Sequence, residues 1–322
     1  METSTKQTLN EKKERLFDWF DRNDCAVAFS GGVDSATLAK ALVLATVRRP
    51  TLTTEDGAST GVKKAPPTGF FAVGATSTDE EKREARVLAA EIGIALQVLE
   101  TQELNDERFV ANSPERCYWC KKIRFADLGR LAVATLRSAD GSEGEKERNG
   151  AAQTVEKTKV PLVLIDGTNA DDANDFRPGT KAAREAGVRS PFAELGITKA
   201  EIRALARSWG LSVAEKPSNP CLATRIGYGL PLDVATLRRI EATEIAVKRF
   251  GFSTCRVRVD APGAARIEVP ESEIDTASTP DVRRALVAEL RALGFAFVSL
   301  DLEGFASGKG NRILDANLNV VN

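Results

Sequence analysis

The sequence predicts an α/β fold: a doubly wound parallel sheet followed by a smaller C-terminal α+β domain. The first observation is that short apolar runs alternate with helical patterns, as parallel strands alternate with crossover helices. The second is that this alternation stops after about residue 228, where a long helix and closely spaced strands follow. We therefore expect two domains in the 322 residues, at 1–228 and 229–322.

Local sequence patterns predict the helices and strands of the first domain. Apolar residues at helical spacing predict an amphipathic helix over 8–22. Thr198 is a suitable N-cap for a helix over 199–210. The other elements are strands at 25–29, 70–75, 96–99 and 160–166 and helices at 36–47, 78–92 and 121–137.

The second domain is expected to contain two helices and three strands. In chain order these are a helix, two strands, a helix and a strand, at 232–250, 254–259, 265–269, 280–293 and 295–300. Two polar segments, 48–68 and 138–159, interrupt the first domain, and we expect them to be surface loops without chemistry.

The composition excludes several classes of function. Lys and Arg number 45 and Asp and Glu 46, so the chain has no general attraction for nucleic acid. The absence of His excludes His-ligated metals and Ser-His-Asp triads. No apolar run reaches the roughly 20 residues that span a bilayer, and the N-terminus lacks a signal-peptide pattern. We therefore expect a cytoplasmic protein that does not enter membranes.

The segment SGGVDS follows the first apolar run and opens a helix. Gly31 and Gly32 let the backbone approach an anion, and the free N–H groups and the dipole of the helix favour negative charge. Ser30 and Ser35 add hydroxyl donors, and Asp34 either helps hold Mg²⁺ or fixes the loop. The segment is not a Walker A loop. A phosphate-binding turn is favoured over a Gly-Gly turn without a ligand.

A second loop is expected beside this one. Asp166-Gly167-Thr168 follows the fourth strand, as Ser30-Gly31-Gly32 follows the first. Ligands of such sheets bind beyond the carboxyl ends of the strands. The two loops therefore predict a single site.

Three of the five cysteines lie in distinctive sequence. Cys117 and Cys120 form a CxxC, and Cys221 lies in the segment PCLATR. An odd number of cysteines in a chain without a leader argues against a disulfide framework. Two sulfurs at CxxC spacing are close enough to share one metal.

Several interpretations of these cysteines remain open. A structural zinc would need a fourth ligand from Cys25, Cys255 or a carboxylate. A second interpretation is a redox dithiol, and a third is unpaired thiols that only pack against neighbouring residues. An iron–sulfur cluster on three cysteines would leave one iron open, with Arg116, Lys121 and Lys122 compensating its charge.

The segments taken together resemble a known family. SGGVDS after an apolar strand resembles the PP-loop of ATP pyrophosphatases, which have an adenine nucleotide alpha hydrolase-like fold. The series SGGVDS, RCYWCKK, DGTNADDANDFRPG, KPSNPCLATRIGYG and LDLEGFASG, from about residue 10 to 310, resembles the LarE family of ATP-dependent sulfur transferases. That family acts in making the nickel-pincer nucleotide cofactor of lactate racemase.

The resemblance implies a reaction and its cofactors. With ATP and Mg²⁺, the enzyme would adenylate the carboxylates of pyridinium-3,5-biscarboxylic acid mononucleotide and thiolate them to the bisthiocarboxylic counterpart. One form of the family gives up the sulfur of a single Cys, and the other uses three Cys to hold a 4Fe–4S cluster that carries an extra sulfide. With Cys117, Cys120 and Cys221, this sequence looks like the cluster form, and a sacrificial Cys221 is the alternative.

The tail domain contains a second set of candidates. Arg256 and Arg258 alternate on one strand face, which suits a bidentate grip on phosphate. The resemblance implies that these two and Glu244 line a phosphate or metal site near a subunit interface, and that the chain forms homo-oligomers, by analogy hexamers. Asp275 is a further candidate for that set. Additional pocket candidates are Arg225, Asp172 and Trp119, whose ring would stack on a pyridinium or pack over the cluster.

Three competing functions use some of the same residues. A PP-loop tRNA thiolase would need a basic face or an RNA-binding module, and the balanced charge argues against it. An amide-forming synthetase that uses ammonia would leave the three cysteines without a role. A non-catalytic nucleotide sensor would bind ATP without releasing pyrophosphate.

Overall fold

The computed structural model describes residues 2–48, 67–139, 162–174 and 178–314. The expected surface loops at 48–68 and 138–159 lie almost entirely outside these residues. The chain divides into two compact units. Unit 1 comprises Met1–Val73, Glu80–Thr101 and Lys121–Ser218, and unit 2 comprises Gly74–Asp79, Gln102–Cys120 and Asn219–Asn322.

These units differ from the expected domains at 1–228 and 229–322. The C-terminal part of unit 2 begins at Asn219, and two segments from the first half of the chain, Gly74–Asp79 and Gln102–Cys120, belong to it. One apolar core explains this grouping, because Phe109 and Leu222 are buried in the same cluster as residues of the C-terminal sheet. Burial against a shared core is not visible in local sequence patterns.

Unit 1 is built on a four-stranded parallel sheet. Its strands are β1 (Cys25–Ala28), β2 (Thr68–Val73), β3 (Ala95–Glu100) and β4 (Val163–Ile165). They lie in the order β3-β2-β1-β4, and every pair is parallel. The expected fold class is therefore confirmed, with each strand close to its expected position.

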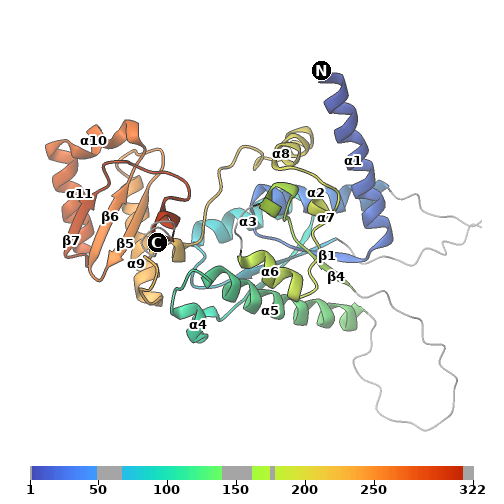
Figure 1. Cartoon of the computed structure of the whole chain (residues 1–322), viewed down its shortest axis with the longest axis horizontal. Coiled ribbons are helices and arrows are strands. Elements are labelled where there is room, and N and C mark those ends of the chain that lie inside the picture. Colours follow the sequence, from blue (N-terminus) through green and yellow to red (C-terminus); the bar gives the residue numbers. More distant parts are fainter. Residues whose placement is uncertain (1, 49–66, 140–161, 175–177, 315–322) are drawn as a thin grey trace, which may run out of the picture. The chain divides into compact units, whose positions relative to one another are not determined.

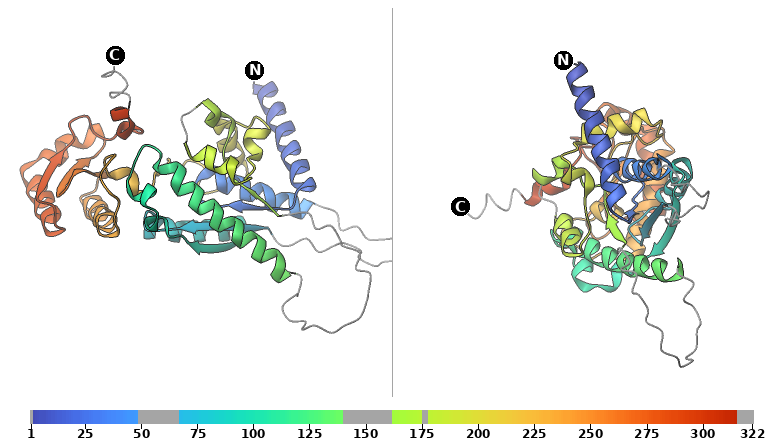
Figure 2. Two further views of the ribbon diagram at one scale, coloured as in Figure 1. Left: turned by 60° about the horizontal axis from the view of Figure 1, so that its bottom comes forward. Right: turned by 90° about the vertical axis from the view of Figure 1, so that its right-hand side faces the viewer.

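Helices cover both faces of this sheet, as in a doubly wound fold. Because side chains alternate along a strand, Val27 and Phe71 enter one core while Ala26 and Phe70 enter another. Figures 1 and 2 show α2 on one side of the sheet and α5 and α6 on the other. The first core includes α1 (Glu2–Arg22), α2 (Val33–Arg48), α3 (Asp79–Ile92), α7 (Pro191–Glu194) and α8 (Lys199–Ser208), and the second includes α5 (Arg116–Ala139) and α6 (Pro178–Glu185).

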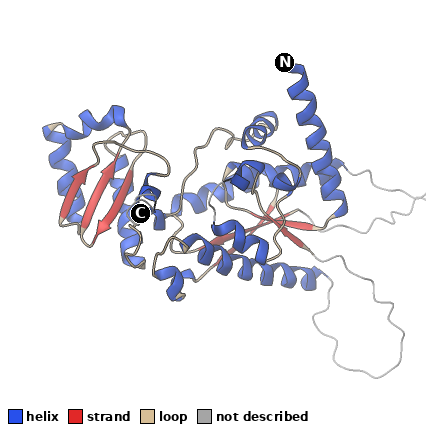
Figure 3. Ribbon diagram, viewed as in Figure 1, coloured by secondary structure: helices blue, strands red, loops and turns tan. Residues whose placement is uncertain are grey.

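Unit 2 contains a three-stranded mixed sheet (Figure 3). The strands are β5 (Arg256–Ala261), β6 (Ala264–Glu268) and β7 (Phe297–Leu300), with β5 antiparallel and β7 parallel to β6. The helices include α9 (Val234–Lys248) and α11 (Pro280–Ala292), both expected, and α4 (Glu107–Val110) and α10 (Ile274–Ser278), which were not. The unexpected helices are too short to show a helical period. Among the described residues, no helix has the length and apolar character of a membrane span.

Candidate functional site

The SGGVDS loop lies where the strand order of the unit 1 sheet reverses. From β1 the chain proceeds to β2 and β3 on one side and returns to β4 on the other. Cys25 pairs with Val163 and Val27 with Ile165, so the loops after β1 and β4 start from adjacent strand ends. This is the position at which open α/β sheets bind their ligands.

The SGGVDS loop is held in shape by its own serines. The backbone N–H of Ser30 donates to Ser35 Oγ at 3.1 Å, and the two hydroxyl oxygens lie 3.0 Å apart. Ser35 Oγ in turn donates to the carbonyl of Gly32 at 3.1 Å. Gly31 has φ +72°, in the left-handed region that favours glycine. The loop is therefore pre-shaped before any ligand binds, while Ser30 and Gly32 remain exposed.

Gly167 allows the loop after β4 to approach the start of α2. A Cβ at this position would lie 2.8 Å from Asp34 Cβ and 2.8 Å from the backbone N of Ser35. Real Cβ atoms do not come this close, so any side chain here would displace the SGGVDS loop. The two loops expected to share a site therefore do meet in unit 1.

Asp34 forms an ion pair that the sequence did not predict. Both carboxylate oxygens accept a hydrogen bond from Lys199 Nζ, each at 2.6 Å. Lys199 is the first residue of α8, where a cation is disfavoured by the helix dipole. Its backbone N–H donates to Asp171 in the loop after β4. In the sequence, the sole sign that Lys199 has a role outside the helix is that a lysine stands in the first helical turn.

The carboxylates after β4 are largely engaged within their own loop. Asp166 accepts hydrogen bonds from the backbone and hydroxyl of Thr168 and from the Ser190 hydroxyl, at 2.7–3.1 Å. Asp172, a pocket candidate from the sequence, is buried and accepts from the backbone of Asn169 at 3.0 Å. These bonds fix the loop beside Asp34. The end of the DGTNADDANDFRPG segment, at 175–177, lies outside the described residues.

The three cysteines of interest all belong to unit 2. Cys117 is exposed in the first turn of α5, Cys120 lies one turn later and is half-buried, and Cys221 is half-buried at the start of the short helix Leu222–Arg225. Across the described part of the chain, no three Cys, Asp or Glu side chains are gathered as a metal ligand set. Cysteine sulfur is a suitable ligand for iron or zinc, but the three sulfurs are not gathered around one point in this structure.

Cys25 and Cys255 do not complete the set. Cys25 lies in unit 1, on β1. Cys255 is fully buried, and burial raises the pKa of its thiol to about 12, with a further contribution from nearby Glu244. Because metals bind the thiolate, the Cys255 sulfur is a poor ligand. Cys255 is therefore a poor candidate for the fourth ligand of a structural zinc.

Arg116 connects the CxxC helix to the segment that carries Cys221. Its Nη1 donates to Asn112 Oδ1 and to the carbonyl of Ala223, the latter at 2.8 Å, and the side chain is buried. Asn112, at φ +52°, donates to the carbonyls of Gly227 and Leu230. Arg116 thus holds the backbone around both cysteine segments. Its expected role, compensation of the charge of a cluster, stays a prediction.

The two lysines after the CxxC belong to unit 1. Lys121 packs along Gly179 and lies over the Phe125 ring at 5.6 Å, and Lys122 lies 3.6 Å from Glu185 on α6. These contacts lie among α5 and α6. The expected compensation of cluster charge by Lys121 and Lys122 stays a prediction.

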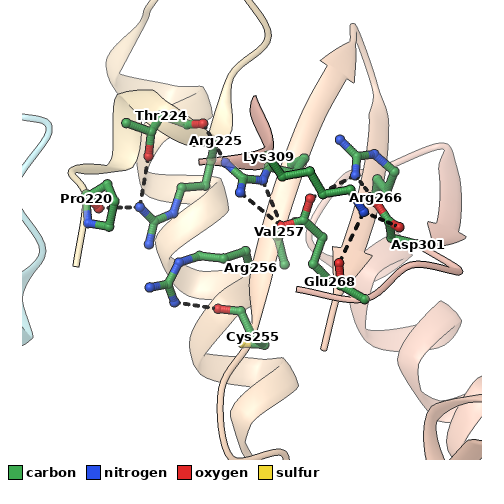
Figure 4. Close-up of polar contacts among 12 residues, drawn as sticks. Pro220, Thr224, Arg225, Cys255, Arg256, Val257, Arg266, Glu268, Asp301 and Lys309 are labelled. Carbon is green, nitrogen blue, oxygen red and sulfur yellow. Dashed lines mark hydrogen bonds and ion pairs between the residues drawn. The ribbon is translucent and has the colours of Figure 1, made fainter. Parts of the chain in front are cut away.

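Arg225 and Glu244 form a buried ion pair in unit 2 (Figure 4 shows Arg225). Arg225 Nε and Nη2 donate to the two Glu244 oxygens at 3.0 and 3.3 Å, and Nη1 donates to the carbonyls of Pro220 and Cys221. Glu244 also accepts from the backbone N–H of Val257. Both proposed ligand residues are thus saturated by protein groups, and together they hold the Cys221 segment onto α9 and β5.

The two arginines of β5 have different partners. Arg258 donates to Glu268 Oε2 at 3.0 and 3.1 Å and to the carbonyl of Thr224, and Glu268 is shared with Arg266. Within the described residues, the hydrogen bonds of Arg256 go to neutral acceptors: the Cys255 carbonyl at 2.7 Å (Figure 4) and Asn219 Oδ1 at 2.9 Å. Burial, followed by repulsion from Arg225, lowers the pKa of Arg256. Among the ion pairs of the described residues, none neutralises Arg256.

Comparison with known proteins identifies the family. No protein-family model matches the chain. It is 33% identical over 308 residues to the pyridinium-3,5-bisthiocarboxylic acid mononucleotide synthase of Lactiplantibacillus plantarum, covering 95% of this chain and 96% of that protein. The chain belongs to this synthase family, LarE. It is therefore an enzyme, and the resemblance seen in the sequence is confirmed.

Other relatives of this LarE family member carry no assigned activity. An uncharacterized protein of Synechocystis sp. is 34% identical, covering 95% of this chain and 99% of that protein. An uncharacterized protein of Methanocaldococcus jannaschii is 26% identical, covering 93% and 97%. Among solved structures, the NMN synthetase of Francisella tularensis matches with a TM-score of 0.41 and 14% identity, covering 66% of this chain and 75% of that one.

Two further candidates in this LarE family chain have defined places in unit 2. Trp119 is half-buried against the unit 2 core, and the Arg108 guanidinium lies 4.0 Å from the centre of its ring. Arg108 thus already occupies a position over the indole that a pyridinium would also use. Asp275 is exposed on α10.

Proposed function

We propose that the chain is an ATP-dependent sulfur transferase that converts pyridinium-3,5-biscarboxylic acid mononucleotide to its bisthiocarboxylic counterpart. The relative from Lactiplantibacillus plantarum, a synthase of that product, supports the assignment over nearly the whole chain. The observation that carries the nucleotide half of the proposal is the close approach of Gly167 to the SGGVDS loop. It places two strand-end loops at the switch point of a parallel sheet.

The chemistry begins with activation of a carboxylate. A carboxylate oxygen bonds to the α-phosphorus of ATP, the bond from that phosphorus to the bridging oxygen breaks, and pyrophosphate leaves with the electron pair. A sulfur nucleophile then attacks the carboxyl carbon, and AMP leaves with its oxygen. The first step turns a poor leaving group into a good one, so no histidine base is needed.

The residues of unit 1 fit the first step. The first turn of α2, beside the exposed residues Ser30 and Gly32, presents N–H groups and a positive dipole to the departing pyrophosphate. Asp34, with the hydroxyls of Ser30 and Ser35, offers the hard oxygen donors that Mg²⁺ prefers. When bound, Mg²⁺ would neutralise charge on the phosphates. Ser30, Gly31, Gly32, Asp34 and Ser35 are therefore proposed as the ATP site.

Arg256 is the residue of unit 2 best suited to the phosphate of the mononucleotide. It is a buried cation whose hydrogen-bond partners are neutral, so its charge can attract an anion. Arg258 and Glu244 are proposed to shape this site, because their own charges are matched by Glu268 and Arg225. Homo-oligomer formation through the C-terminal residues remains a proposal by family analogy.

The sulfur is proposed to come from the three cysteines. Cys117, Cys120 and Cys221 share one compact unit, and Cys117 is exposed, which supports binding of a 4Fe–4S cluster. Because the sulfurs are not gathered, cluster binding would require the Cys221 segment and the first turns of α5 to converge. Such a cluster would supply a deprotonated sulfide. The alternative, a sacrificial Cys221, needs only one of the three.

An anaerobic assay tests this function. The purified protein is reconstituted with iron and sulfide, its iron content is measured, and it is mixed with ATP, Mg²⁺ and the pyridinium biscarboxylate. We expect about four iron atoms per chain, by the cluster's composition, together with pyrophosphate and thiolated product. Pyrophosphate release without thiolated product would refute sulfur transfer but leave adenylation intact.

Cysteine variants separate the two sulfur sources. If the cluster is the source, Cys117→Ala, Cys120→Ala and Cys221→Ala should each lose iron and turnover. If only Cys221→Ala loses product and the mass of the wild-type chain falls by one H₂S per sulfur delivered, the sacrificial route is correct. Cys255→Ala is the matched control, since its buried thiol lies outside the proposed set.

A further inference from the structure

We propose that Lys199 is an additional residue of the nucleotide site, exchanging partners when ATP binds. In the ligand-free chain it neutralises Asp34, and in the ATP-bound chain it contacts the phosphates while the metal takes Asp34. The inference rests on the proposed use of ATP and adds a residue that the SGGVDS motif does not contain. No other cation is paired with Asp34 among the described residues.

The geometry shows that Lys199 engages both carboxylate oxygens of Asp34. Its Nζ lies 2.6 Å from both carboxylate oxygens, so the carboxylate faces the ammonium with both of its oxygens. A divalent cation bound to Asp34 would need at least one of these oxygens. Lys199 and the metal therefore compete, and the arrival of one weakens the contact of the other.

Lys199 is also placed to move a short distance. Its backbone is fixed: Thr198 caps α8 in a capping box with Glu201, and the Lys199 N–H donates to Asp171 at 2.8 Å. Its side chain is 38% exposed and ends on four flexible carbons. The ammonium can thus leave Asp34 while the helix stays in place.

The phosphates are the natural second partner. Asp34 is in the first turn of α2, beside the exposed residues Ser30 and Gly32, where the proposed function puts the departing pyrophosphate. An ammonium released from Asp34 at this point would meet oxygens on which negative charge grows as the α–β bond breaks. Lys199 would then stabilise the departing pyrophosphate.

Two binding measurements test the exchange without relying on turnover. Free Mn²⁺ is followed by electron paramagnetic resonance as nucleotide-free protein is added, and α,β-methylene-ATP, which cannot be cleaved at this bond, is titrated by calorimetry in EDTA. For Lys199→Met we expect Mn²⁺ to bind about two- to five-fold more tightly, because a partly exposed ion pair no longer competes. We expect the analogue to bind at least about ten-fold more weakly. A merely structural lysine would not move the two affinities in opposite directions.

Lys216→Met is the matched control. Lys216 Nζ also lies 2.6 Å from a carboxylate, that of Glu84, at a similar exposure of 34%, within unit 1 but outside the two loops. We expect it to leave both affinities unchanged. Lys199→Gln serves as a second variant if Lys199→Met is not folded by circular dichroism.

The outcomes separate this inference from the proposed function. If the wild-type chain binds neither ATP nor the analogue, the proposed function fails. If the wild-type chain binds the analogue and both Lys199 variants bind Mn²⁺ and the analogue as the wild type does, the exchange is refuted. With the exchange correct, pyrophosphate release by Lys199→Met should fall about 100-fold, the scale seen when one donor to a developing charge is removed.

Discussion

Replacing Gly167 with Ala should disable the proposed nucleotide site through a single methyl group. The added Cβ would lie 2.8 Å from Asp34 Cβ, 2.8 Å from Ser35 N and 2.9 Å from Asp34 C. Carbon atoms in contact normally lie about 3.5–4.0 Å apart, so one loop must move by roughly 1 Å. Two of the three atoms are backbone, so no side-chain rotation relieves the clash. Overpacking of this kind costs about 1–3 kcal/mol of the free energy of unfolding.

The functional effect of Gly167→Ala should exceed its effect on stability. Because displaced backbone donors misplace the pyrophosphate, we expect its release to fall about 100-fold, as for other misplacements near 1 Å. The assay is coupled release of pyrophosphate with ATP and the pyridinium biscarboxylate, beside calorimetric unfolding. Gly129→Ala is the control, since Gly129 lies inside α5 with open space around its Cβ position. It should raise stability by about 0.5–1 kcal/mol and leave release unchanged. Normal pyrophosphate release by Gly167→Ala would refute the placement of the nucleotide at these loops.

Two further predictions concern unit 2. Arg256→Ala should raise the KM for the mononucleotide while changing stability little, whereas Arg258→Ala should cost about 1–3 kcal/mol of stability, because the buried Glu268 loses one of its two arginine partners and keeps Arg266; equal effects on KM and on the unfolding temperature would contradict this division. Cys255, with a pKa of about 12 in the folded chain and about 8.5 when unfolded, loses its proton first in the unfolded chain. Stability should therefore fall as pH rises from about 8.5 toward 12, by up to about 1.4 kcal/mol per pH unit, and Cys255→Ala should flatten this decline in chemical unfolding measured across that range. A decline as steep as that of the wild type would show that another group titrates instead.

Most secondary structure was predictable because it depends on local pattern. The run before SGGVDS became β1, and the amphipathic stretch with Thr198 as its N-cap became α8 with a full capping box. The strand of the second domain expected at 254–259 is β5, Arg256–Ala261, shifted by two residues. Short helices such as α4 and α10 escaped prediction, since four or five residues do not complete a helical period.

The candidate site was predictable only as residue types. The sequence predicts that Arg225, Glu244, Arg256 and Arg258 are polar groups near one strand, but not which carboxylate neutralises which cation. In the structure Glu244 forms an ion pair with Arg225, and Glu268 forms one with Arg258. The hydrogen-bond partners of Arg256 are neutral. Charge pairing depends on distances between segments far apart in the chain, and those distances are set by packing.

The sequence by itself determined the chemistry available to this protein. SGGVDS after an apolar strand and three cysteines predict anion binding and sulfur chemistry, and the absence of His excludes a histidine base. These conclusions follow from composition and from short spacings between residues, which do not depend on the tertiary structure.

Only the tertiary structure decided which of these residues meet. It brought Gly167 against Asp34, paired Asp34 with Lys199 from α8, and gathered the cysteine segments with the C-terminal sheet in one compact unit. The physical reason is that strand order and shared apolar cores join segments separated by a hundred residues or more, and no local pattern records which strands become neighbours.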